Sequence, residues 1–358
     1  MKKHFKLMLM AFSILLLALG GLLGLLTVKY TQTPASQDAR SVVLEVMPAM
    51  SFQAVAQELK KVGVINNVKL FYLYARIKGL RSQLRVGEYE LNTNMLPGQV
   101  LTIITSGKSL TKPFVVPEGL NIFETSELFE KQGFGTREEF LALTKDKSLV
   151  KNLLGEDAES LEGYLFPETY LITKFMTVED VIVAMVRRFQ SVYSEAVKQN
   201  QVKNWTTHQV VTLASIVEKE TGAPQERKII SSVFHNRLKK HMRLQTDPTV
   251  LYGIAIESGQ LPKNIRKSDL LRPTPYNTYV ISSLPPGPIS NPGREAIVAA
   301  MNPEATDFLF FVSHNDGTHE FTKTYEDHSN AVRKFQIDPK SREGKSWRDL
   351  KRSEKIEK

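Results

Sequence analysis

An uncharged apolar run of 22 residues, at positions 7–28, places the strongest limit on how this chain can fold. About 20 apolar residues in a helix cross the hydrocarbon core of a bilayer, while the apolar region of a cleaved signal peptide usually spans about 7 to 15. We therefore expect a retained membrane helix, with a cleaved signal peptide as the alternative. Three lysines precede the run and one, Lys29, lies close behind it, which predicts a cytoplasmic N-terminus at residues 1–6 and an extracytoplasmic remainder.

The rest of the chain has the composition of a folded globular protein, with 42% apolar and 24% charged residues. Its length of 358 residues predicts two or three domains. The absence of cysteine excludes a disulfide scaffold, a thiolate nucleophile and a cysteine-ligated zinc site. A net charge of +9 would suit nucleic acid, a membrane surface or an acidic polymer. Because no basic patch is interleaved with aromatic residues, we expect no nucleic-acid partner.

Beyond a short polar tether at residues 29–40, strand and helix patterns alternate over residues 41–110. Alternating apolar residues indicate strands, and apolar residues three or four apart followed by glycine indicate helices. The expected strands cover residues 42–46 and 86–91, and the expected helices cover residues 52–62, 68–77 and 97–106. The pattern predicts a small β-α-α-β unit followed by one further helix.

Residues 111–335 are rich in motifs and interrupted by proline-containing loops, which indicates a second region of mixed structure. The expected strands cover residues 114–118 and 308–313, and the expected helices cover residues 178–198, 207–222, 226–240 and 294–301. The expected irregular segments are residues 161–170, 243–250, 275–279, 284–293 and 314–321. A basic tail follows at residues 336–358. The chain as a whole is predicted to be an α+β protein.

The helix expected at residues 207–222 carries the most information about a site. Thr206 and Gln209 have the spacing of a capping box, and a glycine at the C-terminal end supplies a stop. Glu218 and Glu220 fall about 160° apart, one on each flank of an apolar face. Only one of the two can face a cleft as a partly buried acid, and helix spacing does not decide which. The alternative is that both are solvated.

Several polar and aromatic residues on the expected loops suit a carbohydrate, because flat rings pack on sugar faces and amides bind hydroxyl groups. They are Tyr164, Gln245, Tyr276, Asn277 and Tyr279. As a loop residue, Asn277 is expected at the surface, so that its loss would weaken turnover and leave stability nearly unchanged. His314 and His319, with Asp316 between them, fit no helical metal motif. We predict no metal and no cofactor.

Five motifs in this order, behind a single N-terminal span, carry a resemblance to a known family. They are LEGYLFPETY, ASIVEKETG, RLQTDPTV, PYNTY and LPPGPI. The chain, from the span to about residue 332, resembles the YceG-like family of membrane-anchored endolytic murein transglycosylases. The resemblance implies a bacterial cell-wall enzyme that cuts the β-1,4 bond between MurNAc and GlcNAc and leaves 1,6-anhydroMurNAc ends, acting in glycan strand termination.

The resemblance also implies particular roles. In that family the first glutamate of the EKET motif is the catalytic acid/base, which corresponds to Glu218 here. The predicted substrate-binding residues are Tyr164, Gln245, Thr246, Asp247, Tyr276, Asn277, Thr278 and Tyr279. A LysM-like fold for residues 41–110, a single-pass position in the cytoplasmic (inner) membrane with the catalytic region periplasmic, and an association with peptidoglycan synthases are further implications. The basic tail lies outside the family pattern.

A single carboxyl group suffices for this chemistry. The C6 hydroxyl of the substrate attacks the anomeric carbon, and an intramolecular attack gains a large effective molarity. Glu218 would first protonate the glycosidic oxygen and then accept the proton of that hydroxyl. Two alternatives remain: a non-catalytic peptidoglycan-binding anchor, indifferent to Glu218, and a glycan hydrolase, which needs a second carboxylate. Asp247 is the nearest candidate for that second carboxylate.

Overall fold

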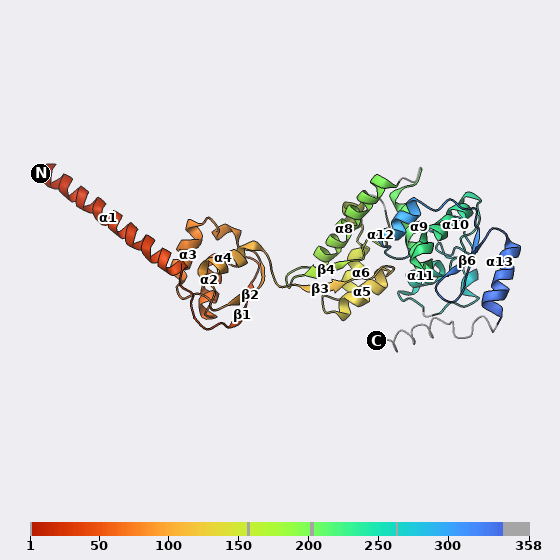
Figure 1. Cartoon of the computed structure of the whole chain (residues 1–358), viewed down its shortest axis with the longest axis horizontal. Helices are drawn as coiled ribbons and strands as arrows, with labels where there is room; N and C mark the ends of the chain where they lie inside the picture. Colours follow the sequence, from red (N-terminus) through yellow and green to blue (C-terminus); the bar gives the residue numbers. More distant parts are fainter. Residues whose placement is uncertain (1, 156–157, 201–203, 263, 339–358) are drawn as a thin grey trace. The chain divides into compact units, whose positions relative to one another are not determined.

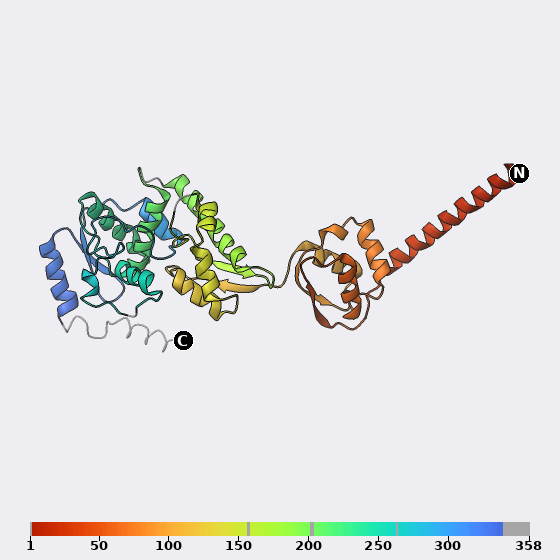
Figure 2. The ribbon, with the colours of Figure 1, turned by 180° about the vertical axis from the view of Figure 1, so that it is seen from behind.

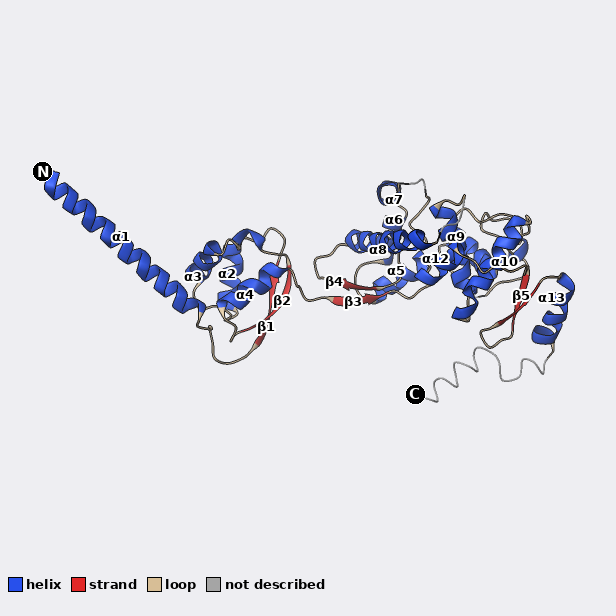
Figure 3. Ribbon diagram, turned by 45° about the horizontal axis from the view of Figure 1, so that its top comes forward, coloured by secondary structure: helices blue, strands red, loops and turns tan. Residues whose placement is uncertain are grey.

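The computed structural model describes residues 2–155, 158–200, 204–262 and 264–338. The chain divides into two compact units, of which the first comprises Met1–Pro113 with Leu171–Met176 and the second comprises Phe114–Tyr170 with Thr177–Lys358. Helices dominate both units, and the strands of the described residues form three two-stranded sheets (Figure 3). The protein is therefore of mixed α+β structure and mostly helical. From residue 339 onward, the predicted basic tail lies outside the described residues.

The first unit begins with the long helix α1, Lys2–Thr31 (Figure 1). Its segment Phe12–Thr31 has a mean hydropathy of 2.1 and is long and apolar enough to cross a membrane, a test that a signal sequence also passes. Large apolar side chains on this helix are exposed, with exposed fractions of 63% for Leu15 and 76% for Leu17. An apolar helix without a protein core around it is what a membrane anchor requires.

The remainder of the first unit has the β-α-α-β order that the sequence predicts. Strand β1 (Ser41–Val46) pairs antiparallel with β2 (Gly87–Asn92), with Val46 opposite Gly87. Between and after them lie α2 (Phe52–Lys61), α3 (Val68–Ile77), the 3-10 turn η1 (Arg81–Gln83) and α4 (Pro97–Ser106). Phe71 and Tyr89 are fully buried in the core that these elements enclose. The predicted helix and strand limits agree with the structure to within one residue.

The second unit is built mostly from helices, together with short paired strands. Its elements are β3 (Lys112–Val115), α5 (Ile122–Lys131), α6 (Arg137–Thr144), α7 (Lys147–Leu154), β4 (Thr169–Ile172), α8 (Val178–Gln199), α9 (Thr207–Glu220), η2 (Pro224–Glu226), α10 (Arg227–Lys239), α11 (Asp247–Ser258), η3 (Asp269–Leu271), α12 (Arg294–Met301), β5 (Phe310–Ser313), β6 (His319–Thr322), α13 (Tyr325–Val332) and the π-helical η4 (Arg333–Ile337). Strand β3 pairs with β4, and β5 pairs antiparallel with β6.

Helix α9 lies at the centre of the second unit and packs against α10, α11 and α12 (Figures 1 and 2). The predicted capping box is present, because the Thr206 side chain accepts from the backbone N–H of Gln209 and the Gln209 side chain accepts from that of Thr206. The prediction of one apolar face is wrong. All residues from 210 to 217 are buried, including Ser215, whose hydroxyl group accepts from the backbone N–H of Ile289 at 3.0 Å. Small polar side chains satisfied within the helix or by neighbouring loops make this burial possible.

Two segments expected to be irregular are partly regular in the structure. Residues 243–250 become helical from Asp247, because Pro248 occupies a first-turn position where its missing N–H costs nothing. Residues 314–321 form a turn only as far as Thr318, and β6 starts at His319. Both differences place polar residues at the ends of regular elements, where their positions are better fixed than on free loops.

Candidate functional site

A pocket of about 430 Å³ opens at the C-terminal end of α9. Residues from six segments of the chain line it: Glu220, Arg237, Leu244, Gln245, Asp247, Pro248, Tyr279, Phe311 and His328. Glu220 is the last residue of α9, Asp247 is the first residue of α11, and Phe311 belongs to β5. The pocket therefore depends on elements that are up to 108 residues apart in the sequence, from Glu220 to His328.

Glu220 has the electrostatic environment of an acid that keeps its proton near neutral pH. Burial, with a smaller effect from the nearby negative charge of Asp247, raises the pKa of the Glu220 carboxyl group to about 7, although the positive charge of Arg237 opposes the shift. A carboxyl group in this range is partly protonated at pH 7. It can therefore donate a proton and later accept one, as a general acid and base must.

Tyr279 holds the Asp247 side chain in place through a direct hydrogen bond. The Tyr279 hydroxyl group donates to Asp247 Oδ1 over 2.7 Å. Burial, together with this bond and the negative charge of Asp247, raises the pKa of Tyr279, so the hydroxyl group stays protonated and remains a donor. Tyr279 thus fixes the position of the charge that acts on Glu220.

Arg237 and His328 complete the polar wall of the pocket. Arg237 is 7% exposed, and its guanidinium group donates to the carbonyl oxygens of Leu309 over 2.6 Å and Leu244 over 2.7 Å. Burial and the neighbouring Arg237 charge lower the pKa of His328, which favours the neutral imidazole. The Nδ1 atom of His328 is buried without a hydrogen-bond partner among the described residues.

Glu218 lies on the other flank of α9 and does not line this pocket. Its Oε1 atom is 3.4 Å from Nη2 of Arg227, and its Oε2 atom accepts from the backbone N–H of Gly293 over 3.0 Å. Burial raises the pKa of the Glu218 carboxyl group, while the Gly293 hydrogen bond and the Arg227 charge oppose this. Both oxygen atoms are engaged, and the side chain joins α9 to α10 and to the start of α12.

Six of the predicted substrate-binding residues fall into two groups in the structure. Gln245, Asp247 and Tyr279 line the Glu220 pocket. Thr246, Asn277 and Thr278 are buried, with exposed fractions of 3%, 0% and 0%. The Thr278 hydroxyl group accepts from the backbone N–H of Thr246 over 2.9 Å. The residues of this second group are buried and do not line the pocket.

The expectation that Asn277 lies at the surface is wrong. Its Nδ2 atom donates to the carbonyl oxygen of Arg272 over 2.7 Å and to that of Leu270 over 3.1 Å. Its Oδ1 atom accepts from the backbone N–H of Tyr279 over 2.9 Å. A buried amide that serves backbone groups on both sides is a structural residue, and it sets the conformation of the loop that presents Tyr279.

Tyr164 and Tyr276 lie away from the pocket, although both were expected to be exposed sugar-binding rings. Tyr164 is 2% exposed, its hydroxyl group is 2.9 Å from Nδ1 of His208, and its ring packs edge-on against Phe189. The Tyr276 ring packs against that of Tyr252 with centroids 5.0 Å apart. Aromatic rings with a polar tip are often buried when that tip finds a partner, as it does for Tyr164.

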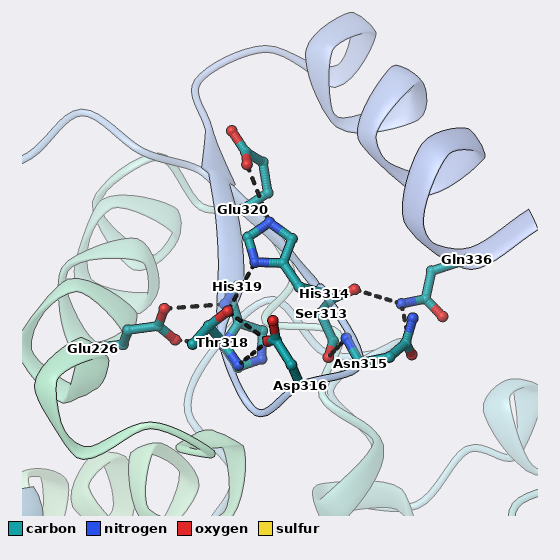
Figure 4. Close-up of polar contacts among 9 residues, drawn as sticks. All are labelled: Glu226, Ser313, His314, Asn315, Asp316, Thr318, His319, Glu320 and Gln336. Carbon is teal, nitrogen blue, oxygen red and sulfur yellow. Dashed lines mark hydrogen bonds and ion pairs between the residues drawn. The ribbon is translucent and has the colours of Figure 1, made fainter. Parts of the chain in front are cut away.

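His314 and His319 are both committed to hydrogen bonds within the protein (Figure 4). His314 Nδ1 is 2.9 Å from the Thr318 hydroxyl group, and His319 Nδ1 is 2.7 Å from Glu226 Oε2. Among the residues that the structure describes, no three His, Asp or Glu side chains are grouped as a metal site would require.

Sequence reasoning missed five residues of the pocket wall, namely Arg237, Leu244, Pro248, Phe311 and His328. Arg237 gave a signal that could have been used, because it lies four residues after Val233 on the buried face of α10. A charge at such a position needs a partner inside the protein. Phe311 and His328 gave no such signal, since only the tertiary fold brings β5 and α13 to Glu220.

A pocket with a buried carboxyl acid, flanked by a second carboxylate and hydroxyl and imidazole groups, is typical of enzymes that use general acid catalysis. The YceG-like family model matches residues 44–334, and the chain belongs to this family.

Relatives from other bacteria support the assignment. An endolytic murein transglycosylase of Bacillus subtilis is 34% identical over 319 residues, covering 84% of this chain and 87% of the relative. One of Streptococcus pneumoniae strain D39 is 30% identical over 349 residues, covering 88% of this chain and 62% of that longer relative. A 2.6 Å crystal structure of a yceG-like protein from Listeria monocytogenes is similar with a TM-score of 0.55 and 31% identity, covering 82% of this chain and all of that one.

Proposed function

We propose that this protein is an endolytic murein transglycosylase that cuts the β-1,4 bond between MurNAc and GlcNAc in peptidoglycan strands and leaves 1,6-anhydroMurNAc ends. Membership of the YceG-like family and the names of the Bacillus and Streptococcus relatives support this proposal. The observation that carries it is Glu218, the first glutamate of the EKET motif, because burial near the C-terminal end of α9 raises the pKa of its carboxyl group.

In the proposed reaction, Glu218 acts first as an acid and then as a base. The protonated carboxyl group donates its proton to the glycosidic oxygen as the bond to the anomeric carbon breaks. The C6 hydroxyl group of the same MurNAc attacks that carbon and gives its proton to the Glu218 carboxylate, which restores the starting state. Because the nucleophile belongs to the substrate, no second carboxylate has to activate water.

Glu218 is the proposed acid, because the family resemblance assigns the role to the first glutamate of the EKET motif and burial raises the pKa of its carboxyl group. Its contacts with Arg227 and Gly293 are compatible with this role, because hydrogen bonds of a catalytic carboxyl group rearrange when substrate binds. Glu220 is the alternative acid, because it shares a pocket with Gln245, Asp247 and Tyr279 and its carboxyl group has a pKa of about 7.

A glycan hydrolase is the second candidate function, favoured by the presence of Asp247 in the same pocket. Hydrolysis would use Asp247 to activate water or to attack the anomeric carbon, and it would give reducing ends. Mass spectrometry of the products distinguishes the two reactions, because an anhydro end differs from a reducing end by the mass of one water. A non-catalytic binding protein would give neither product.

The test of the proposed acid compares Glu218→Gln with Glu220→Gln, two changes of equal charge on one helix. Glutamine keeps the shape of the side chain but cannot transfer the proton, so Glu218→Gln should lower the rate of anhydro-end formation by about 10² to 10⁴ while the protein still folds. Glu220→Gln is the matched control and should keep most of the activity. The reverse result, with activity lost only in Glu220→Gln, would assign the role to Glu220.

We further propose a single-pass position in the cytoplasmic (inner) membrane of a bacterium, with the N-terminus cytoplasmic, the span at residues 7–28 and both folded regions on the periplasmic side. The proposed regions are a tether at residues 29–40, a LysM-like unit at residues 41–110 and a catalytic region at residues 111–335. An anchored enzyme of this kind would act next to newly made strands, which fits strand termination and an association with peptidoglycan synthases.

A further inference from the structure

The loop between β3 and α5 lies against the end of α9 that carries Glu218. The Lys219 side chain donates from Nζ to the carbonyl oxygen of Gly119 over 3.1 Å. A Cβ atom built on Gly119 would lie 3.6 Å from Cγ of Glu218. Gly119 has a φ of 79°, a left-handed conformation that favours glycine. The loop therefore turns sharply beside the proposed acid.

The same loop is fixed to the segment that precedes α12. The backbone N–H of Gly119 donates to the carbonyl oxygen of Asn291 over 2.9 Å, and that of Asn291 donates to the carbonyl oxygen of Leu120 over 2.8 Å. The buried Asn291 amide also donates to Leu120 over 2.9 Å and accepts from the N–H of Leu165 over 3.0 Å. Because these buried groups are all satisfied, the two segments keep one relative position.

Gly293, at the start of α12, lies between two carboxyl groups. Its N–H donates to Oε2 of Glu218 over 3.0 Å. A Cβ atom built on Gly293 would overlap the carboxyl group of Glu118, the loop residue before Gly119. The φ of Gly293 is −74°, which any residue can adopt, so glycine is needed here for space. The missing side chain lets the Glu118 carboxyl group approach the site of the acid.

The fold itself makes no use of the Glu118 carboxyl group. The side chain is exposed, and among the residues that the structure describes it has no hydrogen bond or ion pair. Glu218, by contrast, has a side chain that is only 8% exposed and is paired with Arg227. An exposed charge is most often simply solvated. The loop contacts and the space left by Gly293 distinguish Glu118 from such a charge, because they hold it beside a buried carboxyl group.

The charge of Glu118 acts on Glu218 in the direction that an acid requires. Burial is the main cause of the raised pKa of Glu218, the Gly293 hydrogen bond and the Arg227 charge lower that pKa, and the negative charge of Glu118 raises it. Arg227 Nη2 is 3.4 Å from Oε1 of Glu218 and favours the ionised form. Glu118 opposes this effect.

Other charges on the elements packed against α9 are engaged elsewhere. Lys219, on α9 itself, donates to the loop carbonyl group described above. Arg294 of α12 is paired with a glutamate of α8, and Asp247 of α11 acts on Glu220. The balance of charge at Glu218 is therefore set mainly by one cation from α10 and one anion from the loop.

We propose that Glu118 is a second functional carboxylate beside Glu218, a positioning residue that acts through its negative charge, and that Gly293 brings the two carboxyl groups together. The inference rests on the proposed function and on the role of Glu218 in it. It adds that the loop before α5 balances the charge of Arg227, so that the acid still carries its proton when substrate binds. Beside an arginine alone, a carboxyl group ionises more readily.

The test uses the full-length protein and measures the pH dependence of kcat/KM for anhydro-end formation. Glu118→Gln keeps the shape of the side chain and removes its charge, so Glu218 should lose its proton at lower pH. The alkaline limb should move to lower pH by about 0.5 to 1 unit, with activity near the wild-type value on the acidic side. At about 1 M salt the difference should shrink, because an exposed charge is then screened over about 3 Å. A purely structural role would not depend on salt in this way.

Gly293→Ala tests the geometry without changing a charge. The added methyl group should push the flexible Glu118 carboxyl group aside while the N–H bond to Glu218 remains, and the alkaline limb should again move to lower pH. In a Glu118→Ala background the methyl group has no carboxyl group to displace, so Gly293→Ala should cause no further shift. Glu118→Asp keeps the charge and should move the limb less than Glu118→Gln does.

Glu295→Gln is the matched control, because Glu295 is an exposed glutamate two residues after Gly293 whose charge is not among those acting on Glu218. Its alkaline limb should stay at the wild-type position. An unmoved limb in folded Glu118→Gln, an equal shift in Glu295→Gln, or loss of activity at every pH in folded Glu118→Gln would overturn the inference. Absence of anhydro ends from the wild-type protein would instead overturn the proposed function.

Discussion

At the residue scale, Glu218 and Glu220 have different charged neighbours. Burial is the main cause of the raised pKa of Glu220 and the negative charge of Asp247 adds to it, whereas the charges that act on Glu218 are those of Arg227 and Glu118. With Glu218 as the acid, Asp247→Asn should leave the alkaline limb of activity nearly unchanged, and a limb moved to lower pH would favour Glu220. The measurement is the alkaline limb of kcat/KM for anhydro-end formation, at several pH values from about 5 to 9.

Tyr279→Phe is the control for this prediction, because it removes the hydrogen bond to Asp247 but keeps the charge. Its alkaline limb should also stay unchanged if Glu218 is the acid, and should move less than that of Asp247→Asn if Glu220 is. Complete loss of turnover at every pH in Asp247→Asn, with reducing ends as the wild-type product, would support the hydrolase instead.

The second residue-scale prediction concerns Asn277, whose amide serves buried backbone groups. Asn277→Ala should lower the free energy of unfolding by about 2 to 3 kcal/mol, because it leaves buried carbonyl and N–H groups without partners. Denaturant unfolding measures the change. Asn264→Ala makes the same chemical change at an exposed position and should stay within about 0.5 kcal/mol of the wild-type protein. Equal stability of the two variants would return Asn277 to the list of substrate-binding candidates.

At the scale of elements, Glu162 fixes the start of α5 from the LEGYLFPETY segment. It is 2% exposed, and its Oε2 atom accepts from the backbone N–H of Ile122 over 2.9 Å. Burial raises the pKa of Glu162 from 4.5 to about 8, an effect that hydrogen bonds from Ile122 and Tyr252 only partly offset. The motif therefore has a structural role in joining this loop to α5.

The pH dependence of stability tests this role. The folded state binds the Glu162 proton more tightly than the unfolded state, so the contribution of this group to stability is present below pH 4.5 and is lost as the pH rises to about 8. Glu162→Gln keeps an acceptor for Ile122 and cannot ionise. Its melting temperature should therefore gain on the wild-type value as the pH rises through this window. Glu162→Ala loses the acceptor and should be less stable at every pH, and a constant difference for Glu162→Gln would contradict the prediction.

At the scale of the whole molecule, α1 is an apolar helix that fits a membrane anchor or a signal sequence. An apolar helix with exposed leucines is stable in lipid, and its basic N-terminal flank favours the cytoplasm. A reporter that is active only in the cytoplasm should be silent when fused after Lys358 and active when fused to the N-terminus. The mass of the membrane-bound protein should include α1. A bright C-terminal fusion would contradict the topology, and a chain shortened by the length of α1 would show a cleaved signal peptide.

The sequence by itself determined much of the local structure. The capping box of Thr206 and Gln209 gave the start of α9 correctly, because helix ends depend on side chains a few residues away. The ordered motifs were sufficient to indicate the family. The sequence also placed three residues of the pocket, Gln245, Asp247 and Tyr279, in the predicted site.

Only the tertiary structure decided which side chains share a site. Helix spacing put Glu218 and Glu220 on opposite flanks of α9 but could not say what lay beside each flank, since the neighbours come from α10, α11, β5 and α13. Likewise, a polar loop residue such as Asn277 looks the same in sequence whether its amide faces water or buried carbonyl groups. Burial and charge environment arise from contacts distant in sequence, and these contacts separate a binding residue from a structural one.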